Sequence, residues 1–158
     1  MMFKLSEEGI KKVKQELARY EVKDSAIIPS LYVAQKENGG WINVEVIHHL
    51  SEVMDIPASK INEVFKFYSM FNQEKVGKYH VQVCTNISCA LNGSRELANH
   101  ICHELKVKFN EISPDGRFTI SKVECLGSCG TAPMMQVNEK YYENLTPESA
   151  MNLLRGMK

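Results

Sequence analysis

Four cysteines, arranged in two close pairs, constrain this chain more than any other feature. They form a C-x4-C and a C-x3-C motif, at Cys84, Cys89, Cys125 and Cys129. Each pair comes directly after a run with the alternation of a β-strand, at residues 79–83 and 118–123. We therefore expect each pair on a loop at the end of a sheet. Two such loops can meet at one edge, where they would offer four sulfur ligands.

The thiols alone leave four kinds of chemistry open: disulfides, structural zinc, a redox dithiol and an iron–sulfur cluster. A fifth cysteine, Cys102, makes the number odd, which argues against a pure disulfide framework. Zinc commonly takes pairs of similar spacing, whereas a thioredoxin-type dithiol needs a C-x-x-C motif that the sequence lacks. The wide gaps favour a binuclear [2Fe–2S] centre, and Gly127 and Gly130 would let backbone amides approach its sulfurs.

Length and charge exclude some classes of protein. The 158 residues suit one ordinary domain or two small ones, and the zero net charge offers no field that would attract nucleic acid. No apolar run approaches the roughly 20 residues that cross a bilayer, so we expect no membrane insertion. The N-terminal residues 1–10 lack the pattern of a secretory signal. We expect a cytoplasmic location, where paired cysteines more often hold metal than form disulfides.

The hydrophobic pattern changes near residue 76, and this predicts two domains, 1–75 and 76–158. The first shows apolar residues at helical spacing, with Ser6 and Asn43 as candidate N-caps, and predicts a small bundle of four helices. The second reads as β-α-β-β-β-α and ends in a helix that begins around Pro147. The fold class expected from the pattern is α+β.

Several other residues are predicted to be structural. Cys102 falls on the apolar face of a predicted helix over 93–106, so we expect it in the core. Met134 and Met135 follow Pro133; we expect one to cover the metal centre and the other to pack in the core. The histidines lack a ligand-like spacing from any cysteine, and we expect them at the surface or half-buried: His48, His49, His80, His100 and His103.

The sequence also resembles a known family. The similarity covers nearly the whole chain and is carried by F-Y-S-M-F-N (67–72), V-G-K-Y-H-V-Q-V-C-T-N-I-S-C (76–89), D-G-R-F-T-I (115–120), V-E-C-L-G-S-C-G (123–130), A-P-M-M-Q-V-N (132–138) and Y-Y-E-N-L-T-P (141–147). These segments are similar to the thioredoxin-like [2Fe–2S] subunit, of the E type, in NADH:quinone oxidoreductase, respiratory complex I. Related subunits occur in NAD-linked hydrogenases and formate dehydrogenases.

The resemblance implies a fold, a cofactor and a partner. It implies that a helical docking segment precedes a thioredoxin-like domain, and that Cys84, Cys89, Cys125 and Cys129 hold one [2Fe–2S] cluster. It implies single-electron exchange with the FMN of a partner, the NADH-binding flavin subunit, and a place for this chain peripheral to the membrane through its complex. No dinucleotide or P-loop motif is present, so we expect no catalytic residue and no NADH site in this chain. A free-standing thioredoxin-like ferredoxin is the alternative.

Overall fold

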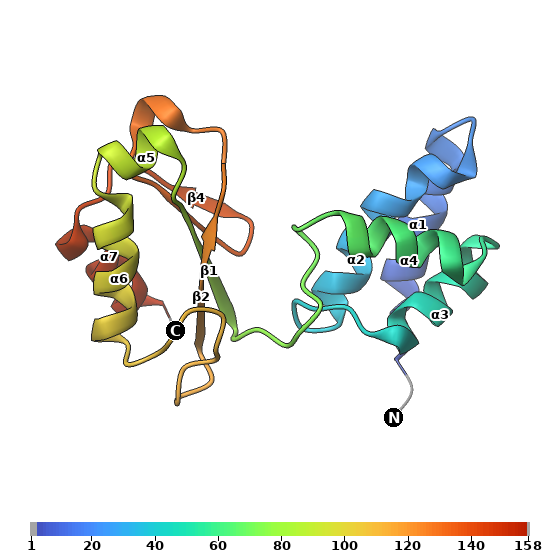
Figure 1. The fold of residues 1–158 in the computed structure, drawn as a ribbon. Helices are drawn as coiled ribbons and strands as arrows, with labels where there is room; N and C mark the ends of the chain where they lie inside the picture. Colours follow the sequence, from blue (N-terminus) through green and yellow to red (C-terminus); the bar gives the residue numbers. More distant parts are fainter. Residues whose placement is uncertain (1–2, 158) are drawn as a thin grey trace. The chain divides into compact units, whose positions relative to one another are not determined.

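The computed structural model describes residues 3–157, and its chain divides into one compact unit that ends at Lys75 and another that begins at Val76. Figure 1 shows helices in the first unit and a sheet with helices in the second. The predicted fold class, α+β with helices followed by an α/β region, is confirmed. Among residues 3–157, no helix combines the length and apolar character that crossing a bilayer requires.

The first unit contains the four predicted helices and one additional turn. They are α1 (Glu7–Arg19), the 3-10 turn η1 (Lys23–Ala26), α2 (Ile27–Glu37), α3 (Val44–Met54) and α4 (Ala58–Phe67). Both predicted N-caps are confirmed, because Ser6 accepts a hydrogen bond from the amide of Gly9 and Asn43 accepts one from that of Val46, each over 3.0 Å. Local side-chain chemistry therefore sets where α1 and α3 begin.

The apolar faces of these helices bury one common core. Val13, Leu31, Leu50 and Ile61 come from the four different helices, and all are completely buried there. Burying side chains of this size stabilises a fold by roughly 1.5–3 kcal/mol each. Phe67, at the end of α4, instead remains 80% exposed.

The second unit is built on a four-stranded mixed sheet. Its strands are β1 (Tyr79–Cys84), β2 (Phe118–Val123), β3 (Met135–Val137) and β4 (Lys140–Tyr142), in the order β2-β1-β3-β4. β1 pairs with β2 in parallel and with β3 antiparallel, and β3 pairs antiparallel with β4. Asn138 turns the β3–β4 hairpin with a φ of 52°. β1 therefore lies between β2 and β3, and Cys84 is its last residue.

Three helices and a short turn complete the second unit. They are α5 (Ile87–Leu91), α6 (Ser94–Glu104), the 3-10 turn η2 (Cys129–Thr131) and α7 (Pro147–Gly156). α6 packs against β1 and β2 and lies beside α7 (Figure 1). The predicted start of the last helix is confirmed: Thr146 forms a capping box with Ser149, and Pro147 is the first helical residue. The predicted order β-α-β-β-β-α matches the structure except that α5 and the turn η2 were not predicted.

Candidate functional site

The parallel pairing of β1 and β2 brings the two cysteine motifs to one edge of the sheet. Cys84 is the last residue of β1, and its partner across the ladder is Val123, the last residue of β2. Because parallel strands end at the same edge, the chain leaves both strands side by side. Cys125 follows β2 by two residues. The predicted placement of each motif at a strand end is therefore confirmed.

Hydrogen bonds join the two cysteine-bearing segments, 84–92 and 123–131. The Ser88 hydroxyl donates to the carbonyl oxygen of Cys129 over 3.1 Å. The amide of Thr85 donates to the carbonyl oxygen of Val123 over 2.9 Å. The Cys84 thiol lies 3.8 Å from the carbonyl oxygen of Glu124. The segments are thus fixed against each other as well as to the sheet.

The four thiols have two different environments. Cys84 and Cys89 are buried, and they pack against the fully buried Met134 in a small apolar cluster. Cys125 and Cys129 are exposed. Met134 thus covers the inner pair, while Met135 belongs to the main core of the unit. The core packing predicted for one of the two methionines is confirmed, and the cover of a metal centre by the other stays a prediction.

Burial makes an isolated thiolate unfavourable at the inner pair. Burial, together with a hydrogen bond and negative charge from Cys84, raises the pKa of the Cys89 thiol to about 11. Thiolates in such a place need positive charge, which a bound metal centre supplies. The soft donor set and the burial of Cys84 and Cys89 fit an iron–sulfur group, and all five cysteines are free rather than joined in disulfides.

The structure does not gather all four sulfurs around one point. The charges of Cys84 and Cys129 both raise the pKa of the Cys89 thiol. The Cys125 sulfur instead accepts a hydrogen bond from the amide of Gly127 over 3.3 Å. Within residues 3–157, no three or more His, Cys, Asp or Glu side chains converge as ligands of one metal ion would. The four-cysteine ligand set therefore stays a prediction.

The glycines expected to help the site differ in role. Gly127 has a φ of 74°, in the left-handed region that favours glycine, and it supplies the amide that reaches Cys125. At Gly130 the φ is not positive, and no protein atom lies within 4 Å of where a Cβ would stand. Gly127 is thus the glycine that the observed loop conformation requires.

Sequence reasoning missed three features around the cysteines. Cys89 lies in helix α5, whose N-cap is Asn86. The Asn86 side chain accepts a hydrogen bond from the amide of Ile87 over 2.7 Å. A residue such as Asn at this position is a capping signal, but five residues are too few for helical periodicity. His80, expected at the surface or half-buried, is only 8% exposed. The contacts of Glu143 with the loop of residues 125–131 are the third.

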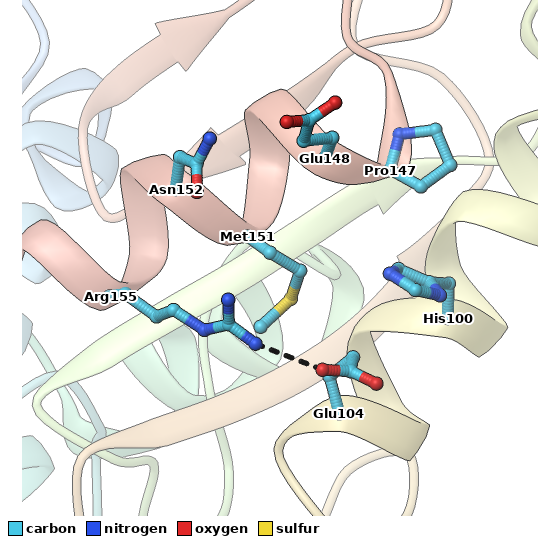
Figure 2. A pocket seen from close by; sticks show the side chains of 7 residues that line it. All are labelled: His100, Glu104, Pro147, Glu148, Met151, Asn152 and Arg155. Atoms are coloured by element: carbon cyan, nitrogen blue, oxygen red, sulfur yellow. Dashed lines mark hydrogen bonds and ion pairs between the residues drawn. The ribbon is translucent and has the colours of Figure 1, made fainter.

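A groove in the second unit is lined by residues other than the cysteines. It has a volume of about 350 Å³ and runs between α6 and α7. Figure 2 shows the residues that line it, among which Arg155 forms a 2.9 Å ion pair with Glu104. The cysteines are not among its lining residues, and Cys102, a residue of α6, is buried in the core, as predicted.

Comparison with known proteins identifies the family of the chain. Residues 13–158 match the family described as thioredoxin-like [2Fe-2S] ferredoxin. The chain belongs to this family. It is 45% identical over 132 residues to the E-type subunit of NADH-quinone oxidoreductase from Rickettsia felis, and the match covers 84% of this chain and 79% of that protein.

Two further similarities extend the comparison. NADH dehydrogenase [ubiquinone] flavoprotein 2, mitochondrial, of Dictyostelium discoideum is 41% identical over 158 residues, which cover 99% of this thioredoxin-like [2Fe–2S] ferredoxin but 64% of that protein. Among solved structures, the NAD+-reducing [NiFe]-hydrogenase in the air-oxidized state matches with a TM-score of 0.67 and 20% identity, over 79% of this chain and 22% of that one. At this identity the likeness concerns the fold alone.

Proposed function

We propose that this chain is an electron-transfer subunit of an NADH-oxidising complex of the complex I type. The observation that carries the proposal is the parallel pairing of β1 and β2, which places both cysteine motifs at one sheet edge. The relatives from Rickettsia felis and Dictyostelium discoideum are named as parts of NADH-oxidising enzymes, which favours a complex subunit over a free-standing ferredoxin. The chain would work at the periphery of a membrane complex on the cytoplasmic side.

The proposed ligands of the cluster are the four thiolates: Cys84, Cys89, Cys125 and Cys129. A [2Fe–2S] cluster would supply reversible one-electron storage, and all-thiolate ligation favours a low potential. The amide of Gly127 would partly neutralise the negative charge on the sulfur of Cys125 through its hydrogen bond. Met134, fully buried against Cys84 and Cys89, would keep water from the inner pair.

The proposed partner is a flavin subunit that binds NADH and carries FMN. The unit that ends at Lys75 would serve as a docking segment, in keeping with the division into domains 1–75 and 76–158. Support comes from Phe67, which is 80% exposed and forms an edge-to-face contact with Tyr68. Exposed aromatic side chains are enriched in protein interfaces.

Metal analysis of the full chain, purified without oxygen, tests the ligand assignment. We expect iron and acid-labile sulfide in equal amounts, and visible absorbance that falls on reduction. Replacing any of the four proposed ligands by alanine should abolish the absorbance. Cys102→Ala is the matched control and should retain it, because Cys102 is a core residue. A colourless protein that contains zinc would overturn the proposal.

Mixing with a flavoprotein tests the partner. The cluster-loaded chain should bind a purified NADH-oxidising flavoprotein subunit of the same organism. NADH should then bleach its visible absorbance, and only when the flavoprotein is present. Bleaching by NADH without the flavoprotein would contradict the assignment of the NADH site to the partner.

A further inference from the structure

Strand β4 and the segment that follows it contact the second cysteine loop, residues 125–131, at several points. The Tyr141 hydroxyl donates to the carbonyl oxygen of Leu126 over 2.8 Å. The amide of Asn144 donates to the carbonyl oxygen of Thr131 over 2.8 Å. Between these two contacts, Glu143 reaches the loop with its side chain. The contacts lie on both sides of Cys129 in the sequence.

Glu143 accepts hydrogen bonds from the hydroxyls of Ser128 and Thr131, the latter over 2.6 Å. The two hydroxyls also lie 2.7 Å from each other. Each hydroxyl has one hydrogen to donate, and an ionised carboxylate only accepts hydrogen bonds. Glu143 can therefore accept a hydrogen bond from both hydroxyls. These two hydrogen bonds hold the pKa of Glu143 below its usual value, and the bond from Ser128 has the larger effect. The carboxylate is therefore charged at neutral pH, which strengthens both bonds.

The loop has limited means of holding its own shape. The turn η2 spans three residues, and the amide of Thr131 donates a 3.2 Å hydrogen bond to the carbonyl oxygen of Ser128. Gly127 adds backbone freedom, whose loss on ordering costs free energy. An acceptor fixed next to β4 can offset that cost, because β4 is itself paired with β3 through Tyr142 and Met135.

We propose that Glu143 is a positioning residue for Cys129, because it ties the residues on both sides of that cysteine to the end of β4. The proposal rests on the proposed function only in making Cys129 a cluster ligand. Glu143 would not touch the cluster. Its role is to hold the 125–131 loop so that the Cys129 sulfur is presented in one orientation.

Three variants separate hydrogen bonding from charge. Glu143→Ala removes the acceptor, and Glu143→Gln keeps the oxygen that receives both hydroxyls but removes the charge. Thr131→Val removes one donor and leaves Glu143 in place. Glu111→Ala is the matched control, because Glu111 is an exposed carboxylate in the chain before β2.

Two rates report on the loop in the full chain loaded with its cluster. They are the amide hydrogen exchange of residues 126–131 and the release of iron to a chelator. For Glu143→Ala we expect both to rise by roughly tenfold, since two hydrogen bonds are lost. Thr131→Val should show a smaller rise. Glu143→Gln should stay within about threefold of the wild type, and Glu111→Ala should match it.

The outcomes decide the proposal. Wild-type rates in Glu143→Ala would overturn it, as would equal damage in Glu143→Gln or in Glu111→Ala. If Glu143→Ala does not fold, Thr131→Val decides, and unchanged loop exchange in that variant would overturn the proposal. If the wild type holds no iron, the proposed function fails, but hydrogen exchange still tests the loop: faster exchange in Glu143→Ala alone would support the positioning role.

Discussion

The hydroxyl of Ser88 donates a 3.1 Å hydrogen bond to the carbonyl oxygen of Cys129, and so links the two cysteine motifs outside the sheet. The donor lies in α5, which also contains Cys89, and the acceptor lies in η2. The bond therefore connects one proposed ligand from each motif. Its removal should loosen the motifs relative to each other and leave the sheet intact.

Ser88→Ala should lower the free energy of unfolding by about 1 kcal/mol, the usual contribution of one hydrogen bond. It should also speed the hydrogen exchange of residues 128–131. Urea unfolding and exchange measured by mass spectrometry check the two effects. Ser59→Ala, at an exposed position of α4 in the other unit, is the control and should change neither. Unaltered exchange in Ser88→Ala would show that the link is unimportant.

Gly127→Ala should destabilise the protein by about 1 kcal/mol, because an L-residue at a φ of 74° is strained even where space is free. If the amide shifts away from the sulfur of Cys125, the midpoint potential should also fall, since the reduced state loses a stabilising donor. Redox titration measures the potential. Gly130→Ala is the matched control, and we expect little change there. A larger effect at Gly130 than at Gly127 would contradict this assignment.

His80 should make stability depend on pH. Burial lowers the pKa of its imidazole from 6.5 to about 4. Between these values the unfolded chain binds a proton that the folded chain does not, so stability is complete above pH 6.5 and declines as the pH falls toward 4. A shift of this size corresponds to a loss on the order of 3 kcal/mol once the pH has fallen to about 4.

Urea unfolding at about pH 7.5 and about pH 5, on either side of the ordinary histidine pKa, measures the effect of His80. His80→Gln should reduce the difference between the two pH values, because glutamine does not titrate. His103→Gln should keep the wild-type difference, since the His103 side chain is 86% exposed. Identical pH profiles for His80→Gln and the wild type would mean that another group is responsible.

Substitution of two phenylalanines of α4 should destabilise the protein to very different extents. Phe65 is 4% exposed and belongs to the core of the first unit, so Phe65→Ala should cost about 3–5 kcal/mol. Phe67→Ala should cost less than about 0.5 kcal/mol, because its ring is already in water. Thermal unfolding of both variants checks the pair. A cost at Phe67 equal to that at Phe65 would show that the exposed ring is structurally required.

The features that sequence reasoning predicted correctly depend on neighbours in the chain. Ser6, Asn43 and Thr146 each accept a hydrogen bond from an amide three residues later, so a short window of sequence contains the whole interaction. The same is true of the alternation that marks β1 and β2. The placement of the two cysteine motifs at strand ends could also be predicted, because each motif directly follows its own strand in the sequence.

The burial of His80 shows where such reasoning stops. Alternation along β1 places His80 opposite to Val81 and Val83, and predicts that it is accessible to water. β1 is a central strand, however, and the ring shares a 2.9 Å hydrogen bond with Ser121 of β2, while Asn138 bonds the backbone of His80. A single strand does not reveal which residues cover its second face.

The sequence by itself determined the family, the helical caps, the strands and the four candidate thiols, because each depends on residue type and local spacing. Only the tertiary structure decided that β1 and β2 pair in parallel, that Met134 covers Cys84 and Cys89, and that Glu143 holds the loop around Cys129. These contacts join residues far apart in the chain. They form only when the whole sheet has assembled, since the free energy of ordering each loop is offset by contacts with distant segments.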